Sequence, residues 1–108
     1  MEYAHEVIFC IVNAGFSETV MDAARKHGAR GGTIMRGRGT ANAQIERMFG
    51  VAVTPEKEIV MILVNSSIRN DILHEIYRTA GLNTPGQGIA FALPVDGTAG
   101  ISKSESFD

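Results

Sequence analysis

The sequence is short of the features that mark several classes of protein. It has one cysteine, no tryptophan and three prolines in 108 residues. Because Cys10 is alone, no intrachain disulfide or cysteine-rich zinc site can form, and we expect a reducing, cytoplasmic setting. The longest apolar run, from Val7 to Val12, is far shorter than the ~20 residues of a membrane-spanning helix.

Charge is also scarce and nearly balanced. The formal net charge is −2, which argues against a nucleic-acid-binding protein because such domains are usually basic. Apolar residues make up 44 % of the chain, which predicts one globular domain over residues 1–108 rather than a disordered chain. The stretch from Met1 to Glu6 has no basic residues apart from His5, so we expect no signal peptide.

Glycine, in contrast, is abundant and clustered. Of the twelve glycines, ten fall within residues 28–39 and 81–100. Glycine is used where φ is positive or where the backbone must approach another group closely. Because apolar and charged residues rather than serines separate these glycines, they predict two specialised backbone regions instead of flexible linkers.

Hydrophobic spacing predicts the element order β-α-β-β-α-β. Short β-branched runs predict strands at residues 6–12, 32–36, 57–64 and 89–93. Apolar residues at helical spacing predict helices over 17–27 and 67–80. We expect Ser17 to cap the first helix and Pro94 to end the last strand. The long loop from 37 to 56 is expected to hold one short helical turn, and the polar tail 102–108 to be loose.

This order predicts an α+β fold, the ferredoxin-like βαββαβ sandwich. Its four-stranded antiparallel sheet carries both helices on one face. Three of the predicted strands are apolar on both faces, so the other sheet face would be a large apolar patch, which monomers rarely expose. We therefore expect self-association, for which a closed ring is the simplest symmetric solution.

Two glycine-containing turns are the candidates for chemistry. Residues 32–37 have the glycine spacing of a phosphate-binding P-loop, but Arg38-Gly39-Thr40 lacks the lysine that must follow. What remains is a strand ending in Arg36-Gly37-Arg38-Gly39, either an anion-binding nest beside two cations or a tight turn with solvated arginines. Gly86-Gln87-Gly88 is a second turn of this kind, with the same two interpretations.

Other reactive side chains are dispersed. His5, His27 and His74 lack the spacing of metal ligands, so we expect no metal site and interpret them as surface or helix-end residues. Cys10 lies within an apolar strand and is interpreted as a small core residue. The Met48-Phe49 pair on the long loop either docks within an oligomer or contacts a partner protein.

In order and spacing, these motifs resemble the P-II nitrogen regulatory proteins and their P-II-like relatives. Residues 57–64 are similar to the family's third strand, residues 76–80 to the end of its second helix, and Gly86-Gln87-Gly88 to its B-loop. Gly37-Arg38-Gly39 is similar to the Gly-x-Gly at the base of the family's T-loop, so residues 40–56 correspond to the T-loop. The resemblance covers nearly the whole chain.

The resemblance implies a cytoplasmic homotrimer that is a regulator and not an enzyme. Family members bind ATP, ADP and sometimes 2-oxoglutarate between neighbouring subunits, and the T-loop regulates a membrane transporter or a metabolic enzyme. For this chain the resemblance implies nitrogen metabolism as the context. The residues implied to bind an adenine nucleotide are Thr33, Gly37, Arg38, Gly39, Thr40, Gly86, Gln87 and Gly88. Those implied to contact the regulated partner are Gln44, Arg47, Met48 and Phe49.

Several positions depart from the family pattern, and two other functions stay open. Gln87 replaces the B-loop aspartate, and Ile89 stands where the family has a phosphate-binding lysine, so we expect a weaker grip on a triphosphate. The first alternative is a small ferredoxin-like enzyme of acylphosphatase type, which would recruit Arg38 and Asn42. The second is a metal-tolerance-type trimer, for which the sequence offers no cluster of metal-binding side chains.

Overall fold

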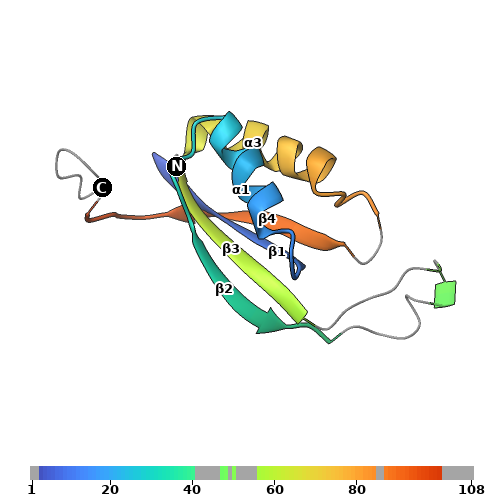
Figure 1. Cartoon of the computed structure of the whole chain (residues 1–108). Coiled ribbons are helices and arrows are strands. Elements are labelled where there is room, and N and C mark those ends of the chain that lie inside the picture. Colours follow the sequence, from blue (N-terminus) through green and yellow to red (C-terminus); the bar gives the residue numbers. More distant parts are fainter. Residues whose placement is uncertain (1–2, 41–46, 49, 51–55, 85–86, 101–108) are drawn as a thin grey trace.

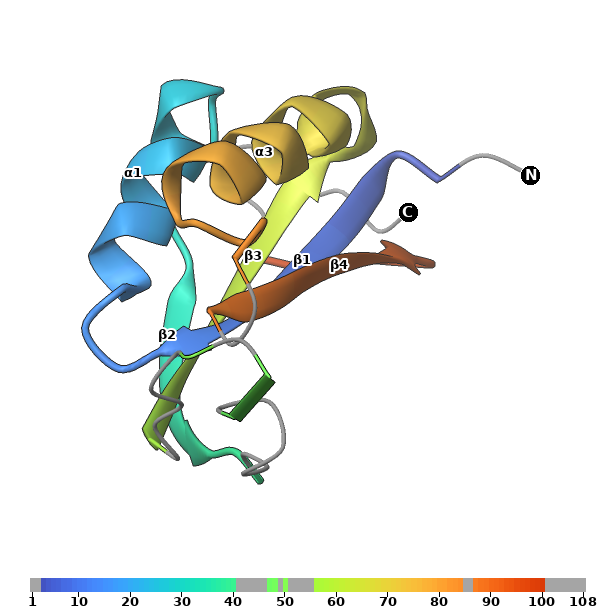
Figure 2. The ribbon, with the colours of Figure 1, turned by 90° about the vertical axis from the view of Figure 1, so that its right-hand side faces the viewer.

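A computed structural model of the chain describes residues 3–40, 47–48, 50, 56–84 and 87–100. Over these residues the elements are β1 (His5–Asn13), α1 (Ser17–Lys26), β2 (Thr33–Arg38), β3 (Glu56–Asn65), α3 (Ser66–Thr79) and β4 (Gly88–Val95). The strands form one antiparallel sheet in the order β2-β3-β1-β4, and α1 and α3 both lie on one face of it (Figures 1 and 2). The predicted ferredoxin-like βαββαβ sandwich is confirmed.

The central pair of strands, β1 and β3, supplies one side of the core. Their register runs from His5 opposite Asn65 to Asn13 opposite Lys57. Since successive side chains of a strand alternate between faces, the even-numbered residues of both strands face the helices. The core combines them with apolar residues of α1 and α3; its largest fully buried side chains include Ile8, Val12, Val20, Met21, Val60, Ile62, Ile72 and Ile76.

Cys10 belongs to this core. Its side chain is fully buried, and burial raises the pKa of the thiol to about 12. A thiol with so high a pKa is almost entirely protonated at neutral pH and is a poor nucleophile. The structure therefore agrees with the interpretation of Cys10 as a core residue.

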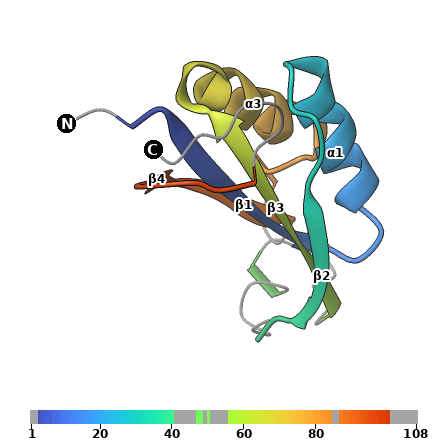
Figure 3. The ribbon, with the colours of Figure 1, turned by 90° about the vertical axis from the view of Figure 1, so that its left-hand side faces the viewer.

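The opposite face of the sheet is apolar, and no helix among the described residues of the chain covers it (Figure 3). The alternation places on it three side chains from each of β1, β3 and β4: Val7, Phe9, Ile11, Ile59, Met61, Leu63, Ile89, Phe91 and Leu93. Phe9 and Phe91 stack with ring centroids 5.6 Å apart. Leu63, Phe91 and Leu93 are each between 39 % and 47 % exposed. This surface, called the open face below, is the apolar patch that the sequence predicts.

The start of α1 differs from the prediction. Ser17 is the first helical residue, the cap position belongs to Phe16, and no side chain of the cap residue bonds to the helix. Instead, Glu58 reaches across from β3, and its Oε1 accepts hydrogen bonds from the backbone N–H groups of Gly15 (3.0 Å) and Ser17 (3.2 Å). The expectation that Ser17 caps the helix was wrong because a carboxylate distant in sequence satisfies these donors.

Two further boundaries differ from the sequence prediction. Pro94 does not end β4, which continues to Val95. Proline is tolerated there because β4 is an edge strand of the sheet, where a missing N–H costs no interior ladder bond. β2 extends through Gly37 to Arg38, opposite Lys57 and Glu56. Of the predicted helical turn in the long loop, Arg47 and Met48 are helical, whereas Ile45 and Phe49 lie outside the described residues.

A buried glutamate joins the two helices. The side chain of Glu75 on α3 is 8 % exposed and receives Lys26 Nζ at 3.3 Å and Arg78 Nη2 at 2.6 Å, with His27 Nε2 at 3.2 Å from its second oxygen. The hydrogen bond with His27 lowers the pKa of Glu75, burial opposes it, and Lys26 and Arg78 lower it further. A carboxylate bonded to two cations and a histidine ring thus connects the end of α1 to α3.

Within the part of the chain that the structure describes, none of the helices has both the length and the apolar character needed to cross a membrane.

The first prediction concerns the entry into β4. Gly88 has φ +149°, and a Cβ there would collide with the carbonyl oxygen of Ile11 on β1. Gly88→Ala should therefore lower the free energy of unfolding by about 2–4 kcal/mol, measured by urea denaturation. Gly31→Ala is the matched control, because no atom lies within 4 Å of its added Cβ. Equal stability of the two variants would show that position 88 does not require glycine.

The second prediction concerns acid stability. The backbone hydrogen bond from Gly15 holds the pKa of Glu58 low, with further lowering by Ser17, and the pKa of Glu75 is also lowered. A folded-state pKa below the unfolded value of about 4.3 adds stability above that pH, which is lost as the pH falls through the folded pKa. Thermal unfolding from pH 7 to pH 3 should show Tm falling below about pH 5.

Glu75→Gln tests this prediction directly. The variant should have a lower Tm at pH 7 and a flatter fall of Tm with acid than the unchanged protein. Asp71→Asn, an exposed substitution on the same helix, is the control and should leave Tm at pH 7 unchanged. An unaltered acid profile in Glu75→Gln would show that this carboxylate does not couple to folding.

Candidate functional site

The two glycine-containing turns lie at the same end of the sheet but on opposite edges. β2 ends at Arg38, with Gly37 opposite Lys57, while β4 begins at Gly88, opposite Val12. In the order β2-β3-β1-β4 the two edge strands are three strand spacings apart, about 14 Å. One chain therefore does not bring the turns together, and a site using both needs a second chain.

The first turn is a strand end and not a nest. A nest alternates right- and left-handed backbone conformations, so one of its residues has positive φ. The described glycines with positive φ are Gly15, Gly28, Gly50, Gly81, Gly88 and Gly100, which leaves out Gly37 and Gly39. Gly37 is paired within β2. The nest interpretation of residues 36–39 was therefore wrong, and their backbone is extended.

Close approach of side chains from β3 accounts for these two glycines. A Cβ on Gly37 would lie 3.1 Å from Ile59 Cδ1, and one on Gly39 would lie 2.8 Å from Lys57 Cε and 3.3 Å from its Cγ. The Lys57 stem thus crosses the face of Gly39. Its ammonium continues to Asn13 on β1 and donates a hydrogen bond to Asn13 Oδ1 at 2.6 Å.

Lys57 is a candidate residue that the motif analysis did not single out. It lies beside Gly37 and Gly39 on the open side of the sheet, and its partner Asn13 is only 6 % exposed. In the sequence, Lys57 stands between Glu56 and Glu58 at the start of the stretch that resembles the family's third strand, where nothing marks it as a binding residue. Only its register position opposite a glycine identifies it.

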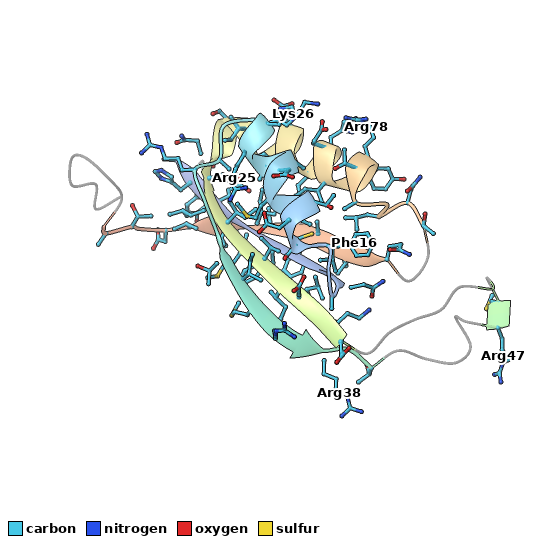
Figure 4. The ribbon with its side chains drawn as sticks, viewed as in Figure 1. Phe16, Arg25, Lys26, Arg38, Arg47 and Arg78 are labelled. Atoms are coloured by element: carbon cyan, nitrogen blue, oxygen red, sulfur yellow. The ribbon has the colours of Figure 1, made fainter. Side chains whose placement is uncertain are left out.

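The arginines of β2 lie on the other face. Arg36 and Arg38 alternate with Gly37 and are opposite Glu58 and Glu56. The Arg36 charge contributes to the lowered pKa of Glu58, behind the hydrogen bonds from Gly15 and Ser17. Arg38 is exposed and points away from the sheet (Figure 4). The end of β2 therefore carries cations on both faces, Lys57 on one and the two arginines on the other.

Thr33 and Thr40 lie at different ends of this region. Thr33 begins β2 opposite Met61, four residues before Gly37 and about 13 Å from it along the strand. Thr40 is exposed just beyond β2. The structure thus places Gly37, Arg38, Gly39 and Thr40 together at one end of the strand and Thr33 at the other.

The second turn carries no charged side chain where it is described. Gly86 lies outside the described residues, the Gln87 N–H donates to the Thr84 carbonyl at 3.3 Å, and Ile89 is 57 % exposed. No residue among 81–84 and 87–89 is basic. A groove of 320 Å³ adjoins the turn, lined by Leu73, Tyr77, Leu82, Gly88, Ile89 and Ala90. This side of the chain offers apolar contact rather than charge.

The predicted partner-binding residues are described in part. Arg47 and Met48 are exposed, Met48 by 67 %, and Figure 4 shows Arg47 well separated from the sheet. Gln44 and Phe49 lie outside the described residues, as does Asn42, which the acylphosphatase alternative needs. Across the described ranges, no three histidine, cysteine or carboxylate side chains gather as metal ligands.

Comparison with known proteins identifies the fold. No protein-family model matches the chain, and no curated protein matches it in sequence. Among solved structures, the chain is similar to PII from Arabidopsis thaliana, a crystal structure with bound citrate. The two are 24 % identical, the match covers 97 % of this chain and 90 % of that one, and the TM-score is 0.73. This chain therefore has the PII-like form of the ferredoxin-like fold.

Proposed function

We propose that this protein is a PII-like regulatory protein that binds a small anionic effector, most simply an adenine nucleotide, between subunits. The observation that carries the proposal is the PII-like fold over nearly the whole chain, with a glycine turn at each edge of the same sheet end. In this proposal the protein is a regulator and not an enzyme. Its targets are a membrane transporter or a metabolic enzyme, with nitrogen metabolism as the candidate context.

The open face supports assembly as a homotrimer. Nine apolar side chains from three strands lie on it, and several are about 40 % exposed or more in the single chain. Covering such a surface with copies of itself removes it from water, which is the dominant driving force for association. Closed rotational assembly also lets the β2 edge of one subunit approach the β4 edge of the next.

That approach would complete the effector site. The end of β2 contributes Arg38 and Thr40 with the glycines beside them, and the start of β3 contributes Lys57. The β4 turn contributes Gln87 and Gly88 with the apolar Ile89. Cations on one side and apolar surface on the other suit a ligand with both phosphate and ring parts. The similar PII structure has citrate, another small anion, bound to it.

The segment between β2 and β3 is the proposed regulatory element. It begins after Arg38, the last residue of β2, and ends before Glu56, the first residue of β3, so both of its ends are at the candidate site. An effector that prefers one arrangement of this segment shifts the population toward it and changes what the loop can contact. Residues 40–56, with Gln44, Arg47, Met48 and Phe49 as contacts, are proposed to bind the regulated partner.

The effector is tested by thermal shift. A panel of ATP, ADP, AMP, cyclic AMP and cyclic di-AMP should contain at least one nucleotide that raises Tm, because binding to the native state stabilises it, by about 2.7 kcal/mol at one hundred times Kd. Arg38→Ala should abolish the shift, while Arg25→Ala, which removes an exposed cation on α1, should keep it. A panel without any shift would exclude the nucleotide.

The trimer is tested by light scattering coupled to gel filtration. The wild-type protein should elute at three times the 11.6 kDa mass of the chain. Leu93→Glu should shift it to the monomer, since the substitution places a charge on the open face at a side chain already 47 % exposed in one chain. His74→Glu on the exposed side of α3 is the control and should leave the mass unchanged. A wild-type monomer at micromolar concentration would refute the assembly.

A further inference from the structure

The hydrogen bond between Lys57 and Asn13 joins a half-buried lysine to a buried amide at the end of two paired strands. The two residues are register partners at the end of the β1–β3 pair, and the ammonium lies 2.6 Å from Asn13 Oδ1. Asn13 is buried, with 6 % of its surface exposed. The lysine is therefore bonded to a group that the sheet itself holds in place.

The stem of Lys57 lies against Gly39. A Cβ on Gly39 would come within 2.8 Å of Lys57 Cε, so the stem occupies the space that a side chain would take. Lysine normally loses substantial rotamer entropy when it is immobilised. Here the hydrogen bond to the buried Asn13 amide reduces the freedom of the ammonium before any ligand arrives.

We propose that Asn13 is the positioning residue of the effector site, holding the Lys57 ammonium near the end of β2, close to Gly39, ready for an anionic group. This inference rests on the proposed function, because it takes an anionic effector to bind at residues 37–40. Asn13 is buried on β1 and belongs to neither glycine turn.

The neutral amide is essential to this role. An ammonium has three N–H donors, and an amide oxygen engages one of them without cancelling the positive charge. An aspartate at position 13 would hold the lysine equally well but would neutralise it. Of the two carboxylates that flank Lys57 in sequence, Glu58 points to the other face and bonds to Gly15 and Ser17, and Glu56 is opposite Arg38 of β2. The charge on Lys57 therefore stays available on the open side.

Preorganisation predicts different effects for two substitutions. Asn13→Ala frees the lysine, so binding must immobilise it again, and affinity for ATP should fall about three- to tenfold. Asn13→Asp keeps the lysine in place but removes its net charge, and affinity should fall by about tenfold or more. Asn13→Asp should also weaken the dependence of affinity on salt concentration, because one fewer charge attracts the ligand.

The first measurement needs no ligand. The chain has three lysines, at positions 26, 57 and 103, so their ammonium groups are resolvable by ¹⁵N NMR. Lys57 should give a slowly exchanging ammonium signal, assigned by its loss in Lys57→Gln. Asn13→Ala should remove that signal and Asn13→Asp should retain it, while Lys26, bonded to Glu75, is unaffected by either. A Lys57 signal that survives Asn13→Ala would overturn the proposal.

The second measurement is ATP titration by calorimetry at two salt concentrations. Asn70→Ala and Asn70→Asp, at an exposed asparagine of α3, are the matched controls and should bind like the wild type. Wild-type affinity in Asn13→Asp would overturn the positioning role. If Asn13→Ala does not fold, the affinity of Asn13→Asp and the Lys57 signal of the wild type test the proposal. Wild-type affinity in Asn13→Asp, or no slowly exchanging Lys57 signal in the wild type, would overturn it.

The two proposals fail in different ways. If the wild type binds no nucleotide, the nucleotide part of the proposed function falls, whatever the lysine spectrum shows. If it binds ATP but the Lys57 signal and the affinities ignore position 13, the proposed function stands and the role of Asn13 is wrong.

Discussion

The antiparallel pairing of β1 with β3 is the constraint on which the other features depend. Its register decides that Ile8 and Ile62 face the helices while Phe9 and Met61 face the open side. The same register ends with Asn13 opposite Lys57. The next residue of β3, Glu58, bonds to the backbone just before α1. Because side chains alternate, a shift of one residue would exchange the core with the open face and would separate these end contacts. Core, helix start and candidate site are therefore determined together.

The sheet's two faces place different demands on the chain. One face is completed internally by α1 and α3, which Glu75 joins through Lys26, His27 and Arg78. The open face holds nine apolar side chains, and no helix among the described residues covers it. The candidate site shares this incompleteness, since its two turns lie on opposite edges of the sheet. In the proposed assembly, one association satisfies both needs, which links effector binding to subunit contact.

Charge is distributed unevenly between the two turns. Lys57, Arg36 and Arg38 are all at the end of β2 and the beginning of β3, whereas the described part of the β4 turn has no charged side chain. In the proposed function the anionic part of an effector would be held from the loop base, beside the segment that contacts the partner. Such an arrangement makes the loop sensitive to the charge of the ligand, because the cations that hold the anion belong to the loop's own ends.

Hydrophobic spacing alone determined the element order, the ferredoxin-like class and the apolar open face, because these depend on which residues are apolar and at what period. Local capping rules failed at Ser17, since the donors of α1 are satisfied by Glu58, forty-one residues away. The sequence also pointed to Gly37 and Gly39 but suggested a nest, whereas the structure shows an extended strand end crossed by Lys57. Neither that lysine nor Asn13 belongs to a sequence motif that predicts ligand binding. Only the pairing of strands distant in sequence decides that they meet, because register is a property of the assembled sheet.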